Sequence, residues 1–208
     1  FLKNGANDFL RKPFSREEFF CRVSQNVDQL ELIGTLQDLA TRDFLTGLPN
    51  RRCFLEHSQR QLHGVQQQDD WIAVAMVDID HFKHINDTFG HDGGDDALRA
   101  CADTVATHAR SGDLVARFGG EEFCLMVPGL APDEAVDYFE TLRQSIAALQ
   151  VPIAGTALRM TVSIGLCCIR PQHDSLHELI TEADRQLYLA KAGGRNRVCS
   201  AALNATPA

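Results

Sequence analysis

The sequence predicts an α/β domain with a mostly antiparallel central sheet flanked by helices, preceded by an N-terminal linker helix. After about residue 70, short apolar runs alternate with segments of helical periodicity, which is the pattern of alternating strands and helices. Residues 114–128 hold two apolar strands separated by a glycine turn, and so short a connection joins antiparallel neighbours. We therefore expect the domain over residues 42–200, the linker helix over 19–41 and a tail over 201–208.

Composition places the chain among soluble globular proteins. Its 208 residues are 44% hydrophobic and 23% charged, and no apolar run is long enough to cross a bilayer, so we expect no membrane insertion. The net charge of −8 argues against general nucleic-acid binding, and we expect no DNA partner. The seven cysteines form no CxxC pair and several stand inside apolar runs, which predicts buried free thiols in a reducing cytoplasm.

The N-terminal segment reads as a short apolar strand followed by the start of a helix. NDFLRKPF places the apolar piece before Lys12 and Pro13, and SREEFF follows with Ser15 as N-cap and Glu18 at the capping-box position. This arrangement resembles the last strand and last helix of a response-regulator receiver domain, whose final strand ends in a Lys-Pro pair. The resemblance implies that residues 1–18 are the C-terminal remnant of a receiver domain, whose phosphoacceptor aspartate would precede residue 1.

Helical periodicity continues from Phe19 to about Ala40. Apolar residues recur three or four positions apart (Phe20, Val23, Val27, Leu30, Ile33, Leu36 and Ala40). Such a stripe is typical of a helix packed on its own domain, and equally of a parallel two-helix stalk that pairs two chains. Because the spacing is imperfect and Gly34 interrupts it, the sequence leaves both alternatives open.

The elements of the α/β domain follow from periodicity and turn residues. In order we expect a buried strand over 71–80, an amphipathic helix over 94–110, the hairpin over 114–128, a helix over 132–149, a strand pair within 156–169 and a final helix over 176–192. A glycine pair closes the last helix.

Four acidic residues stand at two turns of this predicted sheet. Asp78 and Asp80 end the first strand two positions apart and hence on one face, while Glu121 and Glu122 stand at the hairpin turn. Adjacent carboxylates near a core require a cation, a proton or open water. If the hairpin neighbours the first strand, the acids converge into a set of hard oxygen ligands suited to Mg²⁺.

Five segments resemble, in order, the motifs of the GGDEF family, the diguanylate cyclases. They are DFLTGLPNR (43–51), DIDHFKHINDTFGHDGGDDAL (78–98), RSGD (110–113), RFGGEEF (117–123) and AKAGGRNRV (190–198). The resemblance implies a palm-like, nucleotidyl-cyclase-like α+β fold. It also implies condensation of two GTP molecules into cyclic di-GMP and two pyrophosphates, by attack of a 3′-hydroxyl on an α-phosphate across a homodimer.

The resemblance assigns roles to the acidic cluster and to one lysine. It implies that Asp78, Glu121, Glu122 and the Ile79 carbonyl hold two Mg²⁺ ions, or Mn²⁺, in each half of the site. Glu121 is in addition the expected catalytic base, and Lys83 occupies the position that stabilises the transition state.

The resemblance also implies substrate contacts. Asn86 and Asp95 present donors and acceptors that match a guanine edge, while Lys191 and Arg195 supply positive charge for the triphosphate. The family has one Gly-Asp pair where this chain has DGGDD, so we align the family's aspartate with Asp95 and expect Asp96 to be exposed.

Two further pairs complete the expected picture. Arg110 and Asp113 match the family's RxxD site, where cyclic di-GMP binds as product and inhibitor, although an arginine at a helix end beside its neighbouring acid is also a common structural pair. For Asp43 and Arg51 we expect a structural role in tying the opening loop to the domain. Two other functions stay open: a catalytically weak GTP- or cyclic di-GMP-binding module, and a receiver-controlled protein that only dimerises.

Overall fold

The first part of the chain is a long helix. The structure, a computed structural model, describes residues 9, 12–68, 70–153, 155–170 and 176–203, and the chain divides into two compact units, Phe1–Ala40 and Thr41–Ala208. Helix α1 spans Arg16–Thr41, and the Glu18 amide donates to the Ser15 hydroxyl at 3.0 Å, which confirms Ser15 as the N-cap. Most of the strand-like piece predicted before Lys12 lies outside the described residues.

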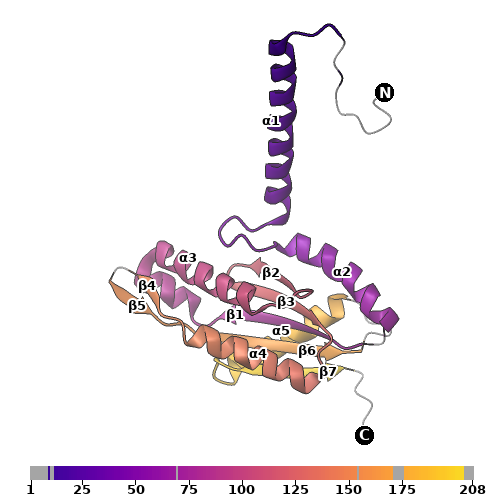
Figure 1. Cartoon of the computed structure of the whole chain (residues 1–208). Coiled ribbons are helices and arrows are strands. Elements are labelled where there is room, and N and C mark those ends of the chain that lie inside the picture. Colours follow the sequence, from indigo (N-terminus) through magenta and orange to yellow (C-terminus); the bar gives the residue numbers. More distant parts are fainter. Residues whose placement is uncertain (1–8, 10–11, 69, 154, 171–175, 204–208) are drawn as a thin grey trace. The chain divides into compact units, whose positions relative to one another are not determined.

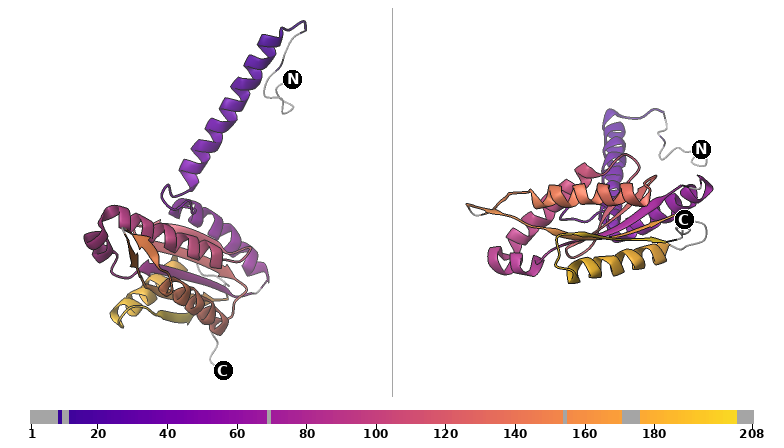
Figure 2. Two further views of the ribbon diagram at one scale, coloured as in Figure 1. Left: turned by 60° about the vertical axis from the view of Figure 1, so that its left-hand side comes forward. Right: turned by 90° about the horizontal axis from the view of Figure 1, so that it is seen from below.

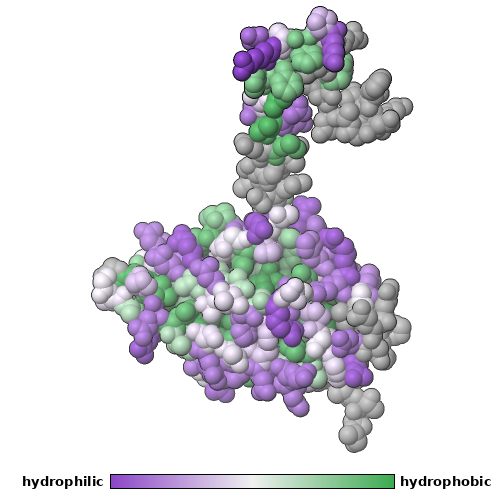
Figure 3. Space-filling view, viewed as in Figure 1, coloured by the Kyte–Doolittle hydropathy of each residue, from purple (hydrophilic) through white to green (hydrophobic). Residues whose placement is uncertain are grey.

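Apolar side chains on the described part of α1 remain exposed to solvent. Phe20, Val23, Val27 and Leu30 are 53%, 43%, 47% and 62% exposed. Figure 3 shows these apolar surfaces along the helix. These four large side chains therefore leave much of their apolar surface in water.

The second unit is built on a five-stranded sheet of order β2-β3-β1-β6-β7 (Figure 1). The strands are β1 Ile72–Ile79, β2 Leu114–Gly119, β3 Glu122–Pro128, β6 Val162–Ile169 and β7 Val198–Leu203. All neighbours are antiparallel except β6 and β7, which run parallel because a helix connects them. The mostly antiparallel sheet flanked by helices is therefore confirmed, and β7 extends three residues past the expected boundary at residue 200.

Two short strands form a separate ribbon. β4 Val151–Ile153 pairs with β5 Thr156–Leu158 through a tight turn at Gly155, whose φ of 83° favours glycine. The prediction of a strand pair within 156–169 is therefore wrong in its pairing. β5 joins β4, whereas β6 pairs with β1 and β7 in the main sheet.

Helices cover both faces of the sheet. They are α2 Arg51–Gln68, α3 Phe82–His108, α4 Pro132–Ala147 and α5 Leu176–Ala192. Alternate residues of β1 enter two different apolar clusters: Ala75 packs on the side of α3 and α4, and Met76 on the side of α2 and α5 (Figure 2). This division explains why the strand is a continuous apolar run rather than an alternating one. Gly165 of β6 lets α5 approach closely, since a Cβ there would lie 2.0 Å from the Leu187 amide nitrogen.

The cysteines are free, but not all are buried. Cys53, Cys101, Cys124, Cys167 and Cys168 are buried, whereas Cys199 is partly exposed and Cys21 on α1 is exposed. Burial raises the pKa of the Cys101 and Cys168 thiols to about 12, so both stay protonated at neutral pH. Among the described residues, no helix combines the length and apolarity needed to cross a membrane.

Candidate active site

The end of β1 and the turn between β2 and β3 bring three acidic residues together. Asp78 stands opposite Glu122 in the β1–β3 register, and the Ile79 amide donates to the Glu121 carbonyl at 3.4 Å. Because the hairpin is the direct neighbour of the first strand, residues about 40 positions apart in sequence share one edge of the sheet. The sequence-based condition for convergence is met for Asp78, Glu121 and Glu122.

A lysine from α5 enters the same edge. The Lys191 ammonium lies 2.7 Å from the Asp78 carboxylate, which is almost fully buried. Burial raises the pKa of Asp78 to about 6, and repulsion from Glu121 and Glu122 adds to the increase. Together these effects outweigh Lys191, whose positive charge lowers the pKa. This edge of the sheet therefore holds more negative charge than Lys191 compensates, and an additional cation would reduce the repulsion between the carboxylates.

The donors at this edge fit Mg²⁺ as a partial ligand set. Within the described ranges, no group of three or more acidic, histidine or cysteine side chains gathers tightly enough to hold a metal ion by itself. Two carboxylates, from Asp78 and Glu121, and the Ile79 carbonyl are nonetheless the hard oxygen donors that Mg²⁺ prefers. Mg²⁺ commonly keeps positions for water and substrate phosphate, so such a set is completed by a bound phosphate rather than by more protein.

Asp80 does not join this acidic cluster. It lies one residue past the end of β1, is 5% exposed, and accepts hydrogen bonds from the Ser163 hydroxyl at 2.6 Å and the Thr161 hydroxyl at 2.7 Å. The Asn196 amide donates to the same carboxylate at 3.0 Å. The expectation that all four acids converge is therefore wrong for Asp80, because Ser163 and Thr161 hold its carboxylate on the β6 side of β1, opposite to the hairpin.

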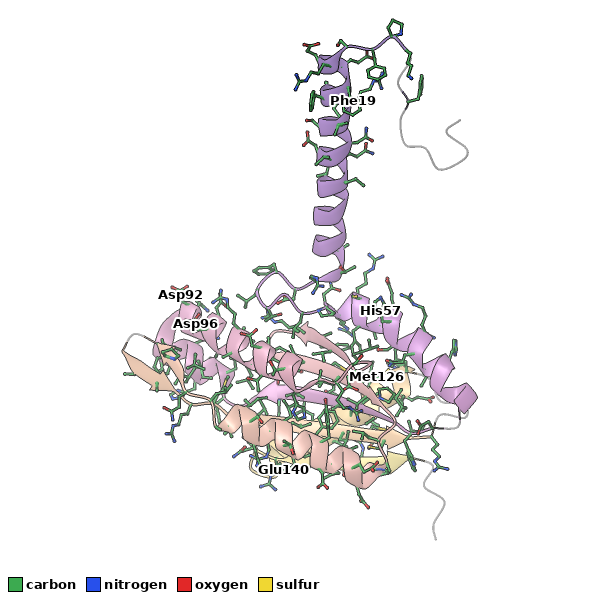
Figure 4. The ribbon with its side chains drawn as sticks, in the orientation of Figure 1. Phe19, His57, Asp92, Asp96, Met126 and Glu140 are labelled. Atoms are coloured by element: carbon green, nitrogen blue, oxygen red, sulfur yellow. The ribbon has the colours of Figure 1, made fainter. Side chains whose placement is uncertain are left out.

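Residues 82–108 form two helical arms, rather than a single helix that begins at residue 94. Helix α3 begins at Phe82, after His81 in the left-handed region, and breaks at Gly90 with φ 75° and ψ 175°. The second arm, which carries Asp92 and Asp96 (Figure 4), packs against β4. The predicted Lys83 sits exposed in the first turn of the first arm.

Asn86 on the first arm lies in close contact with Gly94 on the second arm. A Cβ on Gly94 would lie 2.0 Å from the Asn86 side-chain oxygen, so only glycine allows this approach. That oxygen is buried and has no hydrogen-bond partner among the described residues, which is uncommon for a buried polar atom. The Asp95 and Asp96 side chains on the second arm are 44% and 47% exposed, and their carboxylates lie 3.9 and 2.8 Å from the Arg99 guanidinium.

The turn after α5 carries the other predicted phosphate-binding residue. Arg195 and Asn196 have φ values of 63° and 47°, in the left-handed region that non-glycine residues rarely adopt. The Arg195 amide donates to the Ala190 carbonyl at 3.0 Å, which ties the turn to the end of the helix. Lys191 and Arg195 therefore lie on a single segment, and Lys191 anchors that segment at the acidic edge.

Comparison with known proteins identifies this arrangement. Residues 40–197 match the family described as "Diguanylate cyclase, GGDEF domain". The chain belongs to the GGDEF family. It is similar to "Response regulator PleD" from Caulobacter vibrioides, with 35% identity over 206 residues, and to "Diguanylate cyclase DgcM" from Escherichia coli K12, with 42% identity over 184 residues.

These matches cover most of the chain but less than half of each relative. The aligned parts are 95% and 87% of this chain, and 45% and 43% of PleD and DgcM. Among solved structures, the coiled coil and GGDEF domain of DgcB from Caulobacter crescentus, in complex with c-di-GMP, superposes with a TM-score of 0.80 at 32% identity. That match covers 90% of this chain and 100% of the DgcB chain, and it confirms the palm-like α+β fold.

The arginine of the GGDEF signature turn is a residue that sequence reasoning left without a role. Arg117 binds the Asp43 carboxylate at 2.9 Å and donates two hydrogen bonds to the Gly120 carbonyl, at 2.9 and 2.7 Å. Burial disfavours the ionised form of Asp43, but hydrogen bonds from Arg117 and Thr46 outweigh it and lower the pKa of the carboxyl. Asp43 thus ties the opening loop to the glycine turn, while Arg51 stacks on the Phe118 ring at 4.6 Å.

The RxxD residues of the GGDEF domain contact each other directly. The Arg110 amide donates to the Asp113 carboxylate at 2.8 Å and its guanidinium at 3.3 Å, while the Tyr138 hydroxyl donates to the same carboxylate at 3.0 Å. The Asp113 side chain is only 1% exposed, whereas the Arg110 side chain is 45% exposed and also donates to the Pro128 carbonyl. Tyr138, distant in sequence, could not be linked to this pair from a motif.

Proposed function

We propose that the chain is a diguanylate cyclase that condenses two GTP molecules into cyclic di-GMP. In each half of the reaction, the 3′-oxygen of one GTP bonds to the α-phosphorus of the other and pyrophosphate leaves. The convergence of Asp78, Glu121 and Glu122 beside Lys191 carries the proposal, because it concentrates uncompensated negative charge where phosphate and metal must meet.

We assign a role to each acidic residue where the phosphates would bind. Asp78, Glu121 and the Ile79 carbonyl would hold the metal, with Glu122 beside them, and Glu121 accepts the proton of the attacking hydroxyl. Bound Mg²⁺ or Mn²⁺, at two ions in each half of the site, supplies charge that neutralises the triphosphate and activates the hydroxyl.

The basic residues then bind the triphosphate. Lys191 exchanges its contact with Asp78 for a phosphate oxygen and is joined there by Arg195. Lys83, exposed in the first turn of α3, stabilises the charge that develops in the transition state.

The guanine base is read by the two arms of α3. The unpartnered Asn86 oxygen accepts from guanine, and Asp95 on the second arm accepts from the base N1 and amino protons. Adenine presents no such pair of donors, so this arrangement selects GTP over ATP.

Catalysis requires two copies of the chain. One domain carries one set of residues, and the product contains two symmetry-related phosphodiester bonds, so two half-sites must face each other. The uncovered apolar stripe of α1 supports pairing through residues 19–41, and the similarity to a response regulator supports a receiver remnant over residues 1–18.

Product inhibition is proposed at the RxxD site. The exposed Arg110 guanidinium suits a guanine edge or a phosphate, and Asp113 is already engaged in holding that arginine. Cyclic di-GMP bound there would lower turnover from a site distinct from the acidic edge, by holding half-sites apart. The c-di-GMP complex of the DgcB structure supports binding of this dinucleotide within the family.

One assay tests the proposed activity. The chain is incubated with GTP and Mg²⁺ and the products are identified by mass, alongside Glu121→Gln and the matched surface control Glu56→Gln. We expect cyclic di-GMP from the wild type and the control, and a loss of several orders of magnitude in Glu121→Gln. GTP binding without any product would instead favour a catalytically weak binding module, and product formation by Glu121→Gln would contradict the assigned roles.

A further inference from the structure

Asp80 is a buried carboxylate whose oxygens are occupied by neutral donors. One oxygen accepts from the Ser163 hydroxyl, and the other accepts from the Thr161 hydroxyl and the Asn196 amide. No lysine or arginine of the described part of the chain lies within ion-pair distance of it. A buried polar group is costly unless it is hydrogen-bonded, and these three donors give both carboxylate oxygens a partner.

One of these donors belongs to the strained turn between α5 and β7. Arg195 and Asn196 are consecutive non-glycine residues in the left-handed region, a conformation that costs about 1–2 kcal/mol per residue and needs support from its surroundings. Asp80 holds the turn through the Asn196 amide, and Arg143 from α4 contacts the Asn196 side chain. The turn is thereby fixed from two separate elements.

The two aspartates at the end of β1 hold the same segment at two points. Asp78 binds Lys191 near the end of α5, and Asp80 binds the Asn196 amide five residues later. The first contact is one that the proposed phosphate binding must break, since Lys191 then turns to the triphosphate. The second contact uses a backbone amide, so it does not occupy a side chain that the proposed phosphate binding needs.

We propose that Asp80 is a positioning residue for phosphate binding: it keeps the 195–196 turn left-handed and so directs Arg195 toward the triphosphate. This inference rests on the proposed function. It predicts that losing the Asp80 carboxylate weakens contacts to the β- and γ-phosphates while leaving contacts to the base intact, because Asn86 and Asp95 stand on α3.

The test compares a guanosine monophosphate with a triphosphate analogue that cannot be cleaved. Calorimetry in the presence of Mg²⁺ uses GMP and guanosine 5′-[α,β-methylene]triphosphate, whose α–β bridge cannot be cleaved. In Asp80→Asn we expect about tenfold weaker binding of the triphosphate and unchanged binding of GMP, as for the loss of one charge-assisted hydrogen bond. Arg195→Ala should reproduce this pattern, and the exposed aspartate change Asp184→Asn should leave both affinities at wild-type values.

A second measurement tests the inference without any nucleotide. Hydrogen exchange of the Asn196 amide should be slow in the wild type and at least about tenfold faster in Asp80→Asn. Two milder variants serve if Asp80→Asn does not fold. Thr161→Val removes a donor to the Asp80 oxygen that accepts from the Asn196 amide, and Ser163→Ala removes the donor to the other Asp80 oxygen. Failure of the wild type to make cyclic di-GMP would overturn the proposed function alone. Equal Asn196 exchange, or equal loss of GMP and triphosphate binding, would overturn the role of Asp80.

Discussion

Asp78 and Asp80 are expected to respond to the same substitution with opposite changes in stability. In the protein without nucleotide, burial and the neighbouring glutamates raise the pKa of Asp78 from 3.8 to about 6. A tenfold change in equilibrium is worth about 1.4 kcal/mol, so ionised Asp78 lowers the free energy of unfolding by about 2–3 kcal/mol at neutral pH. Asp78→Asn removes this charge and retains an oxygen that accepts from Lys191.

The direction in which the free energy of unfolding changes with pH follows from proton binding to Asp78. Between pH 3.8 and about 6 the folded protein holds a proton on Asp78 that the unfolded chain has released, so the free energy of unfolding falls as the pH rises. Asp78→Asn lacks this titration. Its advantage over the wild type should therefore be small near pH 4, grow through pH 5 and be complete above about pH 7.

Urea and thermal unfolding in EDTA measure the difference. Near pH 7.5 we expect Asp78→Asn to gain about 2–3 kcal/mol, or roughly 4–12 °C in Tm for a domain of this size. Asp80→Asn should instead lose about 1–3 kcal/mol, since its carboxylate accepts three hydrogen bonds. If Asp78→Asn is no more stable than the wild type at neutral pH, or if its advantage does not vary with pH, the electrostatic account of the acidic edge is refuted.

Three further predictions concern assembly, regulation and base selection. Specific activity should rise with protein concentration until the dimer saturates, as followed by product formation and sedimentation; a monomer with concentration-independent activity would contradict the two-chain site. Arg110→Ala should keep the initial rate and abolish the slowing as product accumulates. Tyr138→Phe removes one hydrogen bond to the Asp113 carboxylate and should weaken cyclic di-GMP binding by a few-fold in calorimetry. Gly94→Ala should displace the Asn86 oxygen and lower the preference for GTP over ATP by at least about tenfold in competition binding, and an unchanged preference would remove Asn86 from base recognition.

The parts of the fold that were predictable carry strong apolar patterns. The run Ile72–Val77 indicates a buried strand, and the structure shows it buried on both faces. Helix α2 was not predicted, because it is largely polar and only a few of its side chains are buried. Its start was visible in principle, since Asn50 caps it by accepting from the Cys53 amide at 3.0 Å. Three-residue strands such as β4 and β5 are too short to show alternation.

In the candidate site, the sequence shows which groups exist and the tertiary fold decides which groups meet. The convergence of Asp78 and Glu121 follows once the hairpin is placed beside β1, and both positions are fixed by the motif and its turn. The hydrogen bonds to Asp80 and the Tyr138 bond to Asp113 come from residues 25 to 116 positions away, and no local pattern encodes such a pairing. The strained conformation of Arg195 is likewise invisible in sequence, because arginine has no preference for that region.

The distribution of the cysteines gives the chain a built-in attachment point for spectroscopic probes. Five of its thiols are shielded by the core, and the raised pKa of Cys101 and Cys168 makes these two unreactive toward maleimides as well. Cys21 is exposed on α1, one residue after Phe20 in the uncovered stripe. A nitroxide or fluorophore attached to the native sequence, with the partly exposed Cys199 changed to serine, would therefore report the separation between two α1 helices directly. The stalk hypothesis becomes a distance measurement on a nearly wild-type chain.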